Sequence, residues 1–116
     1  MWLPSNANVW LYRTPIDFRK QIDGLVLLVA DTLQKDPTSG QLFVFRNRNA
    51  DKIKMLYWED NGFWLLYKRY EKSRFKFPPI VDEAIELSMP ELQWLLSGID
   101  FTRHTPPEKL FVTQFM

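Results

Sequence analysis

Four stretches of the chain have the hydrophobic patterns of β-strands. They lie near residues 8–13, 42–46, 52–58 and 63–70, and each is rich in β-branched or aromatic residues. A short fifth strand fits near residues 84–87. Clusters of Gly, Pro, Asn and Asp separate several of these stretches, as turns do. The pattern predicts a mainly antiparallel sheet of about four to five strands.

The dipeptide Asn61-Gly62 lies between the last two of the four main strands. It is a strong signal for a tight hairpin, because both residues accept the positive φ angles of a two-residue turn. Such a loop would place Trp58 opposite Leu65, and Lys54 opposite Arg69. Two facing cations are unfavourable unless an anion bridges them, so this register favours a phosphate-binding interpretation.

The sequence also predicts two helices. The second, near residues 89–97, has a capping box formed by Ser88 and Glu91 and a left-handed exit at Gly98. We expect an α+β fold in which both helices pack on one face of the sheet and cations occupy the exposed part of the other. The expected domain spans residues 1–101, and a mobile tail spans 102–116. The first helix, near residues 20–34, is predicted from apolar residues on one helical face: Ile22, Leu25, Val26, Val29 and Leu33.

Composition narrows the class of protein. A length of 116 residues fits one domain, and nine Phe, five Trp and four Tyr supply apolar area for its core. The chain has no cysteine, which excludes disulfides and thiolate-bound metals. No apolar run approaches the length of a bilayer span, and the N-terminal residues lack the features of a signal peptide. We therefore expect a cytoplasmic protein with no membrane association.

Charge is unevenly distributed although the net charge is only +1. Nine cations and four anions lie between Arg46 and Lys76, whereas five carboxylates and no Lys or Arg lie between Ile80 and Asp100. A basic segment of this kind suits a polyanion, and the acidic one suits a protein partner. The same cations also suit the solvent face of a half-buried sheet, where their stems cover apolar surface. The sequence leaves both interpretations open.

Aromatic residues are interleaved with cations in 67–70 and in 74–77. Cations make salt-sensitive contacts with phosphate, and exposed rings stack on bases. For the second-tier residue Arg19, a local ion pair with Asp17 or Asp23 competes with a nucleic-acid contact. The predicted nucleic-acid contacts are Arg46, Arg48, Lys52, Lys54, Lys68, Arg69, Lys72 and Arg74, with Arg19 and Lys20 as the second tier.

No catalytic constellation is present in the sequence pattern. The single histidine, His104, lies in the predicted tail, whereas a hydrolytic triad needs a base beside its nucleophile. Carboxylates cluster at Asp82, Glu83 and Glu86, but such runs usually form solvated faces. A metal-dependent nuclease needs carboxylates that converge from separate strands. We therefore predict a non-enzymatic protein with no metal and no other cofactor.

Several motifs, taken in order, resemble a known family. The resemblance runs from about Val9 to Asp100, and the order of the motifs makes it specific. The motifs that carry the resemblance are Asp17-Phe18-Arg19-Lys20, Asp23-Gly24-Leu25, the segment 40–48, the segment 51–58, Gly62-Phe63, the segment 67–71, Phe75 and the segment 95–100. In these motifs the sequence is similar to the small TnpB accessory proteins of the insertion-sequence-66 transposon family.

The resemblance implies an accessory role in DNA transposition. It also implies two protein partners from the same element, a large transposase and a small helix-turn-helix protein, and it transfers no catalytic residues. One departure is Asn49-Ala50, which stands where the family has a basic residue and Gly. DNA is the partner favoured by the basic stretch. The alternative is an adaptor that docks the transposase through the acidic last helix or an aromatic patch, without binding DNA. The sequence does not specify an oligomeric state.

Overall fold

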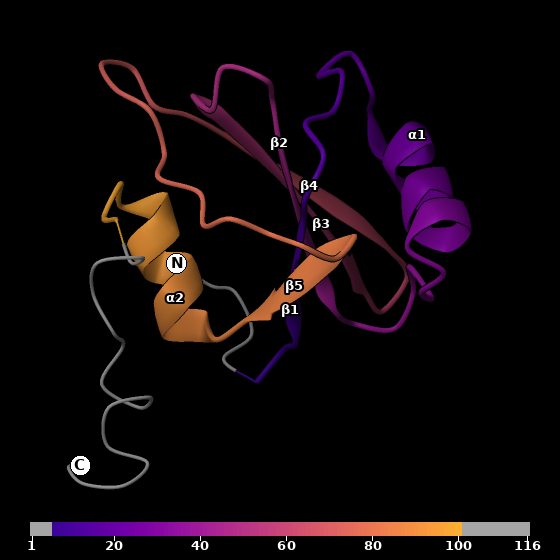
Figure 1. Cartoon of the computed structure of the whole chain (residues 1–116). Helices are drawn as coiled ribbons and strands as arrows, with labels where there is room; N and C mark the ends of the chain where they lie inside the picture. The colour runs from indigo at the N-terminus through magenta and orange to yellow at the C-terminus, as the bar shows by residue number, and fades with distance from the viewer. Residues whose placement is uncertain (1–5, 101–116) are drawn as a thin grey trace, which may run out of the picture.

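The computed structural model describes residues 6–100, which form one five-stranded sheet (Figure 1). The strand order is β4-β3-β2-β1-β5, with β1 and β2 parallel and every other neighbouring pair antiparallel. The predicted α+β class and mainly antiparallel sheet are confirmed, whereas His104 and the predicted tail lie outside the described residues. The strands are β1 (Val9–Tyr12), β2 (Leu42–Arg46), β3 (Lys52–Glu59), β4 (Gly62–Arg69) and β5 (Ala84–Leu87).

The parallel pairing of β1 with β2 requires a crossover, because the chain must return to the same end of the sheet before β2 begins. The crossover contains α1 (Ile22–Leu27), which continues directly into a π-helical turn, η1 (Leu28–Thr32). The predicted helix is therefore confirmed in position, but it is shorter and changes its hydrogen-bonding pattern halfway. Gln34 has a φ of 53° and marks the end of this helical segment.

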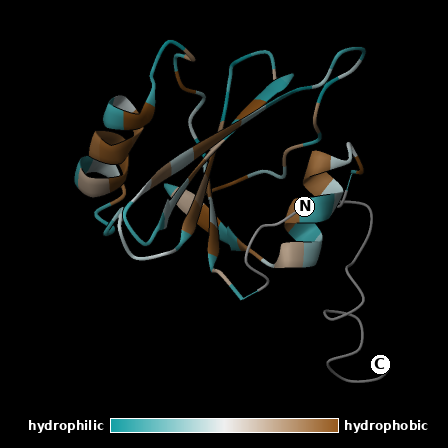
Figure 2. Cartoon of the chain, turned by 180° about the vertical axis from the view of Figure 1, so that it is seen from behind, coloured by the Kyte–Doolittle hydropathy of each residue, from teal (hydrophilic) through white to brown (hydrophobic). Residues whose placement is uncertain are grey.

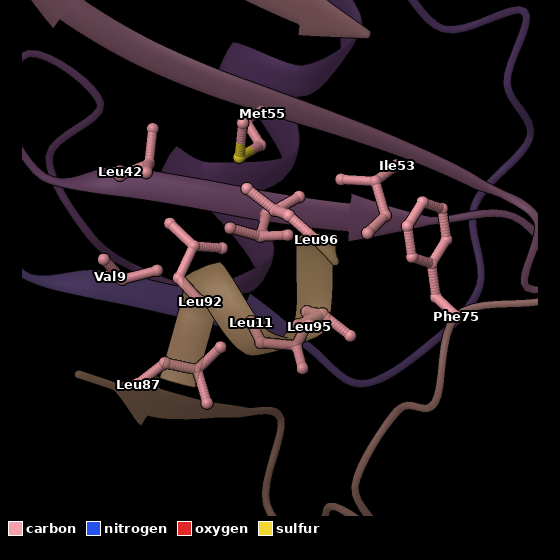
Figure 3. Close-up of a cluster of buried hydrophobic side chains, with 11 residues drawn as sticks. Val9, Leu11, Leu42, Ile53, Met55, Phe75, Leu87, Leu92, Leu95 and Leu96 are labelled. Carbon is pink, nitrogen blue, oxygen red and sulfur yellow. The ribbon is translucent and has the colours of Figure 1, made fainter. Parts of the chain in front are cut away.

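The two helices cover opposite faces of the sheet (Figure 1), so the prediction that both pack on one face is wrong. Leu25 and Val29 of the crossover helix pack with Phe43, Phe45 and Leu56 on one face. On the other face, the hydrophobic side of α2 (Met89–Leu96) packs against the strands (Figure 3). The side chains that meet there include Leu92, Leu95 and Leu96 from α2, and Val9, Leu11, Leu42, Ile53 and Met55 from the strands.

Strand β2 explains why both faces are covered. Its residues 42–45 are fully buried, although successive side chains of a strand point to opposite faces. A strand that is apolar at consecutive positions must be buried on both sides. Neither face of the sheet is therefore broadly exposed to solvent. The expectation that cations occupy the exposed part of one face is thus corrected.

The hairpin between β3 and β4 forms where it was predicted, but its register is different. The loop residues are Asp60 and Asn61, and Glu59 pairs with Gly62. Asp60 takes the positive φ, at 52°, so Gly62 is free to enter the strand. As a result Lys54 lies opposite Tyr67, and the like-charged pair that faces across the ladder is Lys52 and Arg69.

The start and end of α2 follow the sequence closely. The Oγ of Ser88 accepts a hydrogen bond from the backbone N–H of Glu91 at 3.2 Å, and the Glu91 carboxylate accepts one from the Ser88 N–H at 2.8 Å. The predicted capping box is therefore confirmed. Gly98 follows the helix with a φ of 82°, as the predicted left-handed exit requires.

Candidate nucleic-acid interface

Three loops gather at one end of the sheet, where β1, β2 and β4 finish (Figure 1). The backbone N–H of Ile16 donates to the carbonyl of Arg46 at 2.9 Å, and the N–H of Phe75 donates to the carbonyl of Ala50 at 2.8 Å. Figure 2 shows these loops largely in the teal of hydrophilic residues. We call this surface the loop end, and it consists of residues 13–21, 47–51 and 70–79.

The turn between β2 and β3 is held by the side chain of Asn47. Its Oδ1 accepts the backbone N–H groups of Asp51 and Lys52 at 3.1 and 3.0 Å, and its Nδ2 donates to the Asp51 carboxylate at 2.6 Å. These bonds leave Arg48 exposed at the tip. Ala50 has a φ of 62°, a left-handed conformation that glycine adopts more readily. Ala50 is thus the position at which we expected the glycine of the family pattern, and its backbone conformation is one that favours glycine.

The loop after β4 alternates between outward cations and inward rings. Lys72, Arg74 and Lys76 are exposed, whereas Phe75 is buried between them at 3% exposure. The Phe75 ring lies 5.2 Å from the ring of Tyr70, measured between centroids. The expectation that interleaved rings are exposed for stacking on bases is therefore wrong for Phe75. The packed rings of Tyr70 and Phe75 hold the loop against the sheet, while the cations of the same loop point to solvent.

A polar groove of about 490 Å³ lies between this loop and the β2–β3 turn. The hydrogen bond that Asn47 donates to the Asp51 carboxylate lowers the pKa of Asp51, and the positive charges of Lys52 and Arg74 lower it further. Arg48, Lys72, Arg74 and Lys76 form no ion pair with any of residues 6–100. The groove is lined by Asn49, Asp51, Tyr70, Glu71, Lys72, Ser73, Arg74 and Lys76.

Lys54 does not belong to this exposed surface. It is only 2% exposed, and its Nζ donates to the carbonyl oxygens of Phe18 and Lys20 at 2.8 and 2.7 Å. The same ammonium lies 5.1 Å from the Phe18 ring centroid and 5.6 Å from that of Tyr67. Burial lowers the pKa of Lys54, and the charge of Asp17 opposes that shift. The expectation of an exposed Lys54 is wrong, because this cation fastens loop 13–21 to the sheet.

Lys68 is also engaged within the fold. Its Nζ donates to the carbonyl oxygen of Leu96 at 2.7 Å, at the C-terminal end of α2. A cation at this end satisfies an open carbonyl and complements the helix dipole. Lys68 therefore stabilises the helix that covers its own face of the sheet.

The other predicted contact residues are partly compensated. The Nε of Arg69 donates to the Glu71 carboxylate at 2.9 Å, and Arg19 forms an ion pair with Asp17. The local interpretation of Arg19 is thus confirmed. Arg46 is half-buried, with its guanidinium 4.6 Å from the Phe77 ring centroid, and burial lowers its pKa. Lys52 is half-buried next to the loop end, and Lys20 is exposed within it.

Two cations of the loop end were missed as contact residues by sequence reasoning. Lys76 lines the groove with Lys72 and Arg74, and the regular spacing of two residues between these three cations was the signal in the sequence. Arg13 follows β1, is exposed, and its Nη1 donates to the carbonyl of Val81 at 2.9 Å. No sequence signal places Arg13 here, because only the parallel pairing of β1 with β2 brings their ends together.

Within residues 6–100, no three His, Asp or Glu side chains gather closely enough to hold a metal ion. Across the same residues, no helix has the length and apolar character needed to cross a bilayer.

The fold and the loop end define a small α+β protein whose charged groups gather on loops beside an open, polar groove. A family model described as "IS66 Orf2 like protein" matches residues 7–106, and the chain belongs to this family. Membership implies a role in IS66 transposition.

Two curated relatives from Sinorhizobium fredii (strain NBRC 101917 / NGR234) are similar over most of their length. The "Uncharacterized protein y4jC" is 42% identical over 101 residues, which cover 86% of each chain. The "Uncharacterized protein y4hO" is 38% identical over 104 residues, which cover 88% of this chain and 90% of the relative. No solved structure gives a significant match to this chain.

Proposed function

We propose that this chain is a non-enzymatic accessory factor of IS66 transposition that contacts nucleic acid through the loop end. The observation that carries the proposal is a set of four exposed cations on two loops that are hydrogen-bonded to each other. Those four side chains form no ion pair within residues 6–100, so their charge is available to phosphate. They are Arg48, Lys72, Arg74 and Lys76.

The geometry revises which predicted residues belong to the proposed contact. Lys54 and Lys68 are excluded because their ammonium groups already bind backbone carbonyls. Arg46 and Lys52 are half-buried and the charge of Arg69 is offset by its ion pair with Glu71, whereas Arg19 and Lys20 remain the second tier. Asp51 and Glu71 in the groove offset part of the charge. We therefore propose a contact with few phosphates, and hence weak, salt-sensitive binding.

The test is the salt dependence of binding to a DNA duplex from an end of the element. Each phosphate contact contributes about 0.9 to the slope of log affinity against log salt concentration. Lys72→Gln and Arg74→Gln should each reduce that slope by about 1 and weaken binding uniformly across DNA sequences. Gel-shift or fluorescence anisotropy titrations at several salt concentrations measure both quantities.

Lys35→Gln is the matched control, because it also removes one positive charge. Lys35 precedes β2 and therefore lies at the opposite end of the sheet, with its Nζ 3.7 Å from the Trp10 ring centroid. This variant should leave the slope unchanged. An equal loss of slope for Lys35→Gln would contradict a localised contact. Capture of the transposase by a chain that binds no DNA at low salt would favour the adaptor function instead.

A further inference from the structure

Strand β4 is a long edge of the sheet, and its outer side pairs with no strand of residues 6–100. It has eight residues, whereas the opposite edge strand, β5, has four. Long edge strands expose backbone donors and acceptors that can pair with another chain. No proline interrupts β4. The strand is therefore competent for pairing along its length.

The side chains of β4 add exposed apolar surface. Trp64 is 48% exposed and Tyr67 is 54% exposed, although the indole N–H of Trp64 donates to the Glu59 carboxylate at 2.8 Å. A hollow of about 240 Å³ lies at the same edge, lined by Met55, Leu66, Tyr67, Lys68 and Leu96. Trp64, Leu66 and Lys68 share the face covered by α2, because they alternate along the strand. An exposed indole and a mostly apolar hollow thus lie on one face of one edge.

The charges at the two ends of β4 have opposite signs. Glu59 and Asp60 precede the strand, whereas Arg69 and Lys72 lie at and beyond its end. A two-fold axis through the middle of the strand would bring the acidic end of one copy beside the basic end of the other. An isologous contact requires self-complementarity of this kind.

We propose that β4 pairs antiparallel with β4 of a second copy of this chain, about a two-fold axis at Leu66, to form a continuous ten-stranded sheet. A two-fold axis perpendicular to the sheet keeps each face on its own side, so residues of equal parity oppose each other. Trp64 of one copy then lies across from Lys68 of the other. Its indole enters the hollow beside Leu66 and Leu96, and the reciprocal contact forms on the other side of the axis.

The size of this contact sets the expected affinity. One eight-residue strand and one indole per copy form an interface near or below the lower limit of about 1,200 Å² of total buried area for stable complexes. We therefore expect reversible association with a Kd on the order of 10 µM.

Sedimentation velocity of the full chain without DNA tests the proposal, at concentrations from about 1 µM to about 100 µM, on either side of that constant. The wild-type chain should shift from monomer to dimer across this range. Glu59→Lys and Lys72→Glu should each weaken dimerisation by about tenfold or more, through like-charge contacts. An equimolar mixture of the two variants should restore dimers, because each mixed dimer has opposite charges at both ends.

Glu86→Lys on β5 is the matched control, since it reverses one carboxylate on the other edge of the sheet. It should leave dimerisation unchanged, and circular dichroism should show that all variants are folded. A wild-type chain that stays monomeric throughout, or a mixture that fails to restore dimers, would overturn the proposal. So would equal weakening by Glu86→Lys, which would assign the contact to β5. None of these results depends on DNA binding by the loop end.

Discussion

At the scale of single residues, each cation acts according to the groups that surround it. Lys54 and Arg74 both come from the same basic stretch of sequence, yet one binds two carbonyls in the interior and the other lines an open groove. Lys68 binds the end of a helix. The formal charge of a residue thus does not decide whether its charge is available to a partner. The neighbouring carbonyls, rings and carboxylates decide it.

Gly98 gives a stability prediction at this scale. Its φ is 82°, and a Cβ added there would lie 2.6 Å from a ring carbon of Tyr70 and 2.7 Å from its hydroxyl oxygen. Gly98→Ala should therefore lower the free energy of unfolding by about 2–4 kcal/mol, through a left-handed alanine and a steric clash. Urea denaturation measures the change.

Gly40→Ala separates these two causes. Gly40 has a φ of 83°, and a Cβ added there meets nothing within 4 Å. Gly40→Ala should therefore lower the free energy of unfolding only by the cost of a left-handed alanine, about 1–2 kcal/mol. Equal losses in the two variants would show that the contact with Tyr70 does not contribute.

Asp17 gives a prediction for pH. Hydrogen bonds from the Arg19 side chain and backbone lower the pKa of Asp17 to about 2 from its ordinary value of 3.8. Because the folded-state pKa is depressed, the ion pair stabilises loop 13–21 above pH 4, and this contribution is lost as the pH falls towards 2. Arg19→Ala should return the pKa of Asp17 towards 3.8, as measured by NMR titration of its carboxyl carbon.

Asp36 is the internal reference for that titration. Hydrogen bonds from the side chain and backbone of Thr38 lower the pKa of Asp36, and Arg19 takes no part in them. Its titration should be unaffected by Arg19→Ala. An unchanged Asp17 pKa in the variant would show that Arg19 is not the cause of the shift.

At the scale of secondary-structure elements, the hydrophobic patterns carried most of the information. The four main strands end within one residue of their predicted bounds, and α2 begins at its predicted capping box. The hairpin register was wrong because Asp60 took the positive φ that Asn61-Gly62 was expected to supply. Each residue of β3 pairs with a residue two positions earlier on β4 than predicted. Because side chains repeat every two residues along a strand, each residue kept its predicted face while its partner changed.

Lys54 joins two elements, and its removal tests that link. Lys54→Met keeps the apolar stem but leaves the carbonyls of Phe18 and Lys20 without their donor. The expected loss is about 1–3 kcal/mol in the free energy of unfolding, with faster amide exchange in loop 13–21. The salt slope of DNA binding should not change, because no exposed charge is lost.

Lys52→Met is the control for this change on the same strand and face. The Lys52 side chain is half-buried and makes no hydrogen bond or ion pair within residues 6–100. Its replacement should change the free energy of unfolding by only about 0.5 kcal/mol. A loss as large as that of Lys54→Met would argue against a specific role for the two carbonyl bonds.

At the scale of the whole molecule, the crossover between β1 and β2 determines where the charges lie. It places α1 on the face opposite α2 (Figure 1), so both sheet faces are covered, and the four exposed cations of the proposed contact lie on the loops at one end. An antiparallel β4 pairing would then place the loop ends of two copies at opposite ends of the joint sheet. Under both proposals, one dimer carries two separate nucleic-acid contacts.

The sequence by itself determined the positions of the strands, the start and end of α2 and the family, because these depend on local periodicity, capping chemistry and ordered motifs. It also marked residues 67–70 and 74–77 as segments in which cations are interleaved with aromatic residues. Only the tertiary structure decided which cations remain exposed, since burial of Lys54 and the engagement of Lys68 by Leu96 depend on elements far apart in the chain. The same holds for the covering of both sheet faces, which follows from the parallel pairing of β1 with β2.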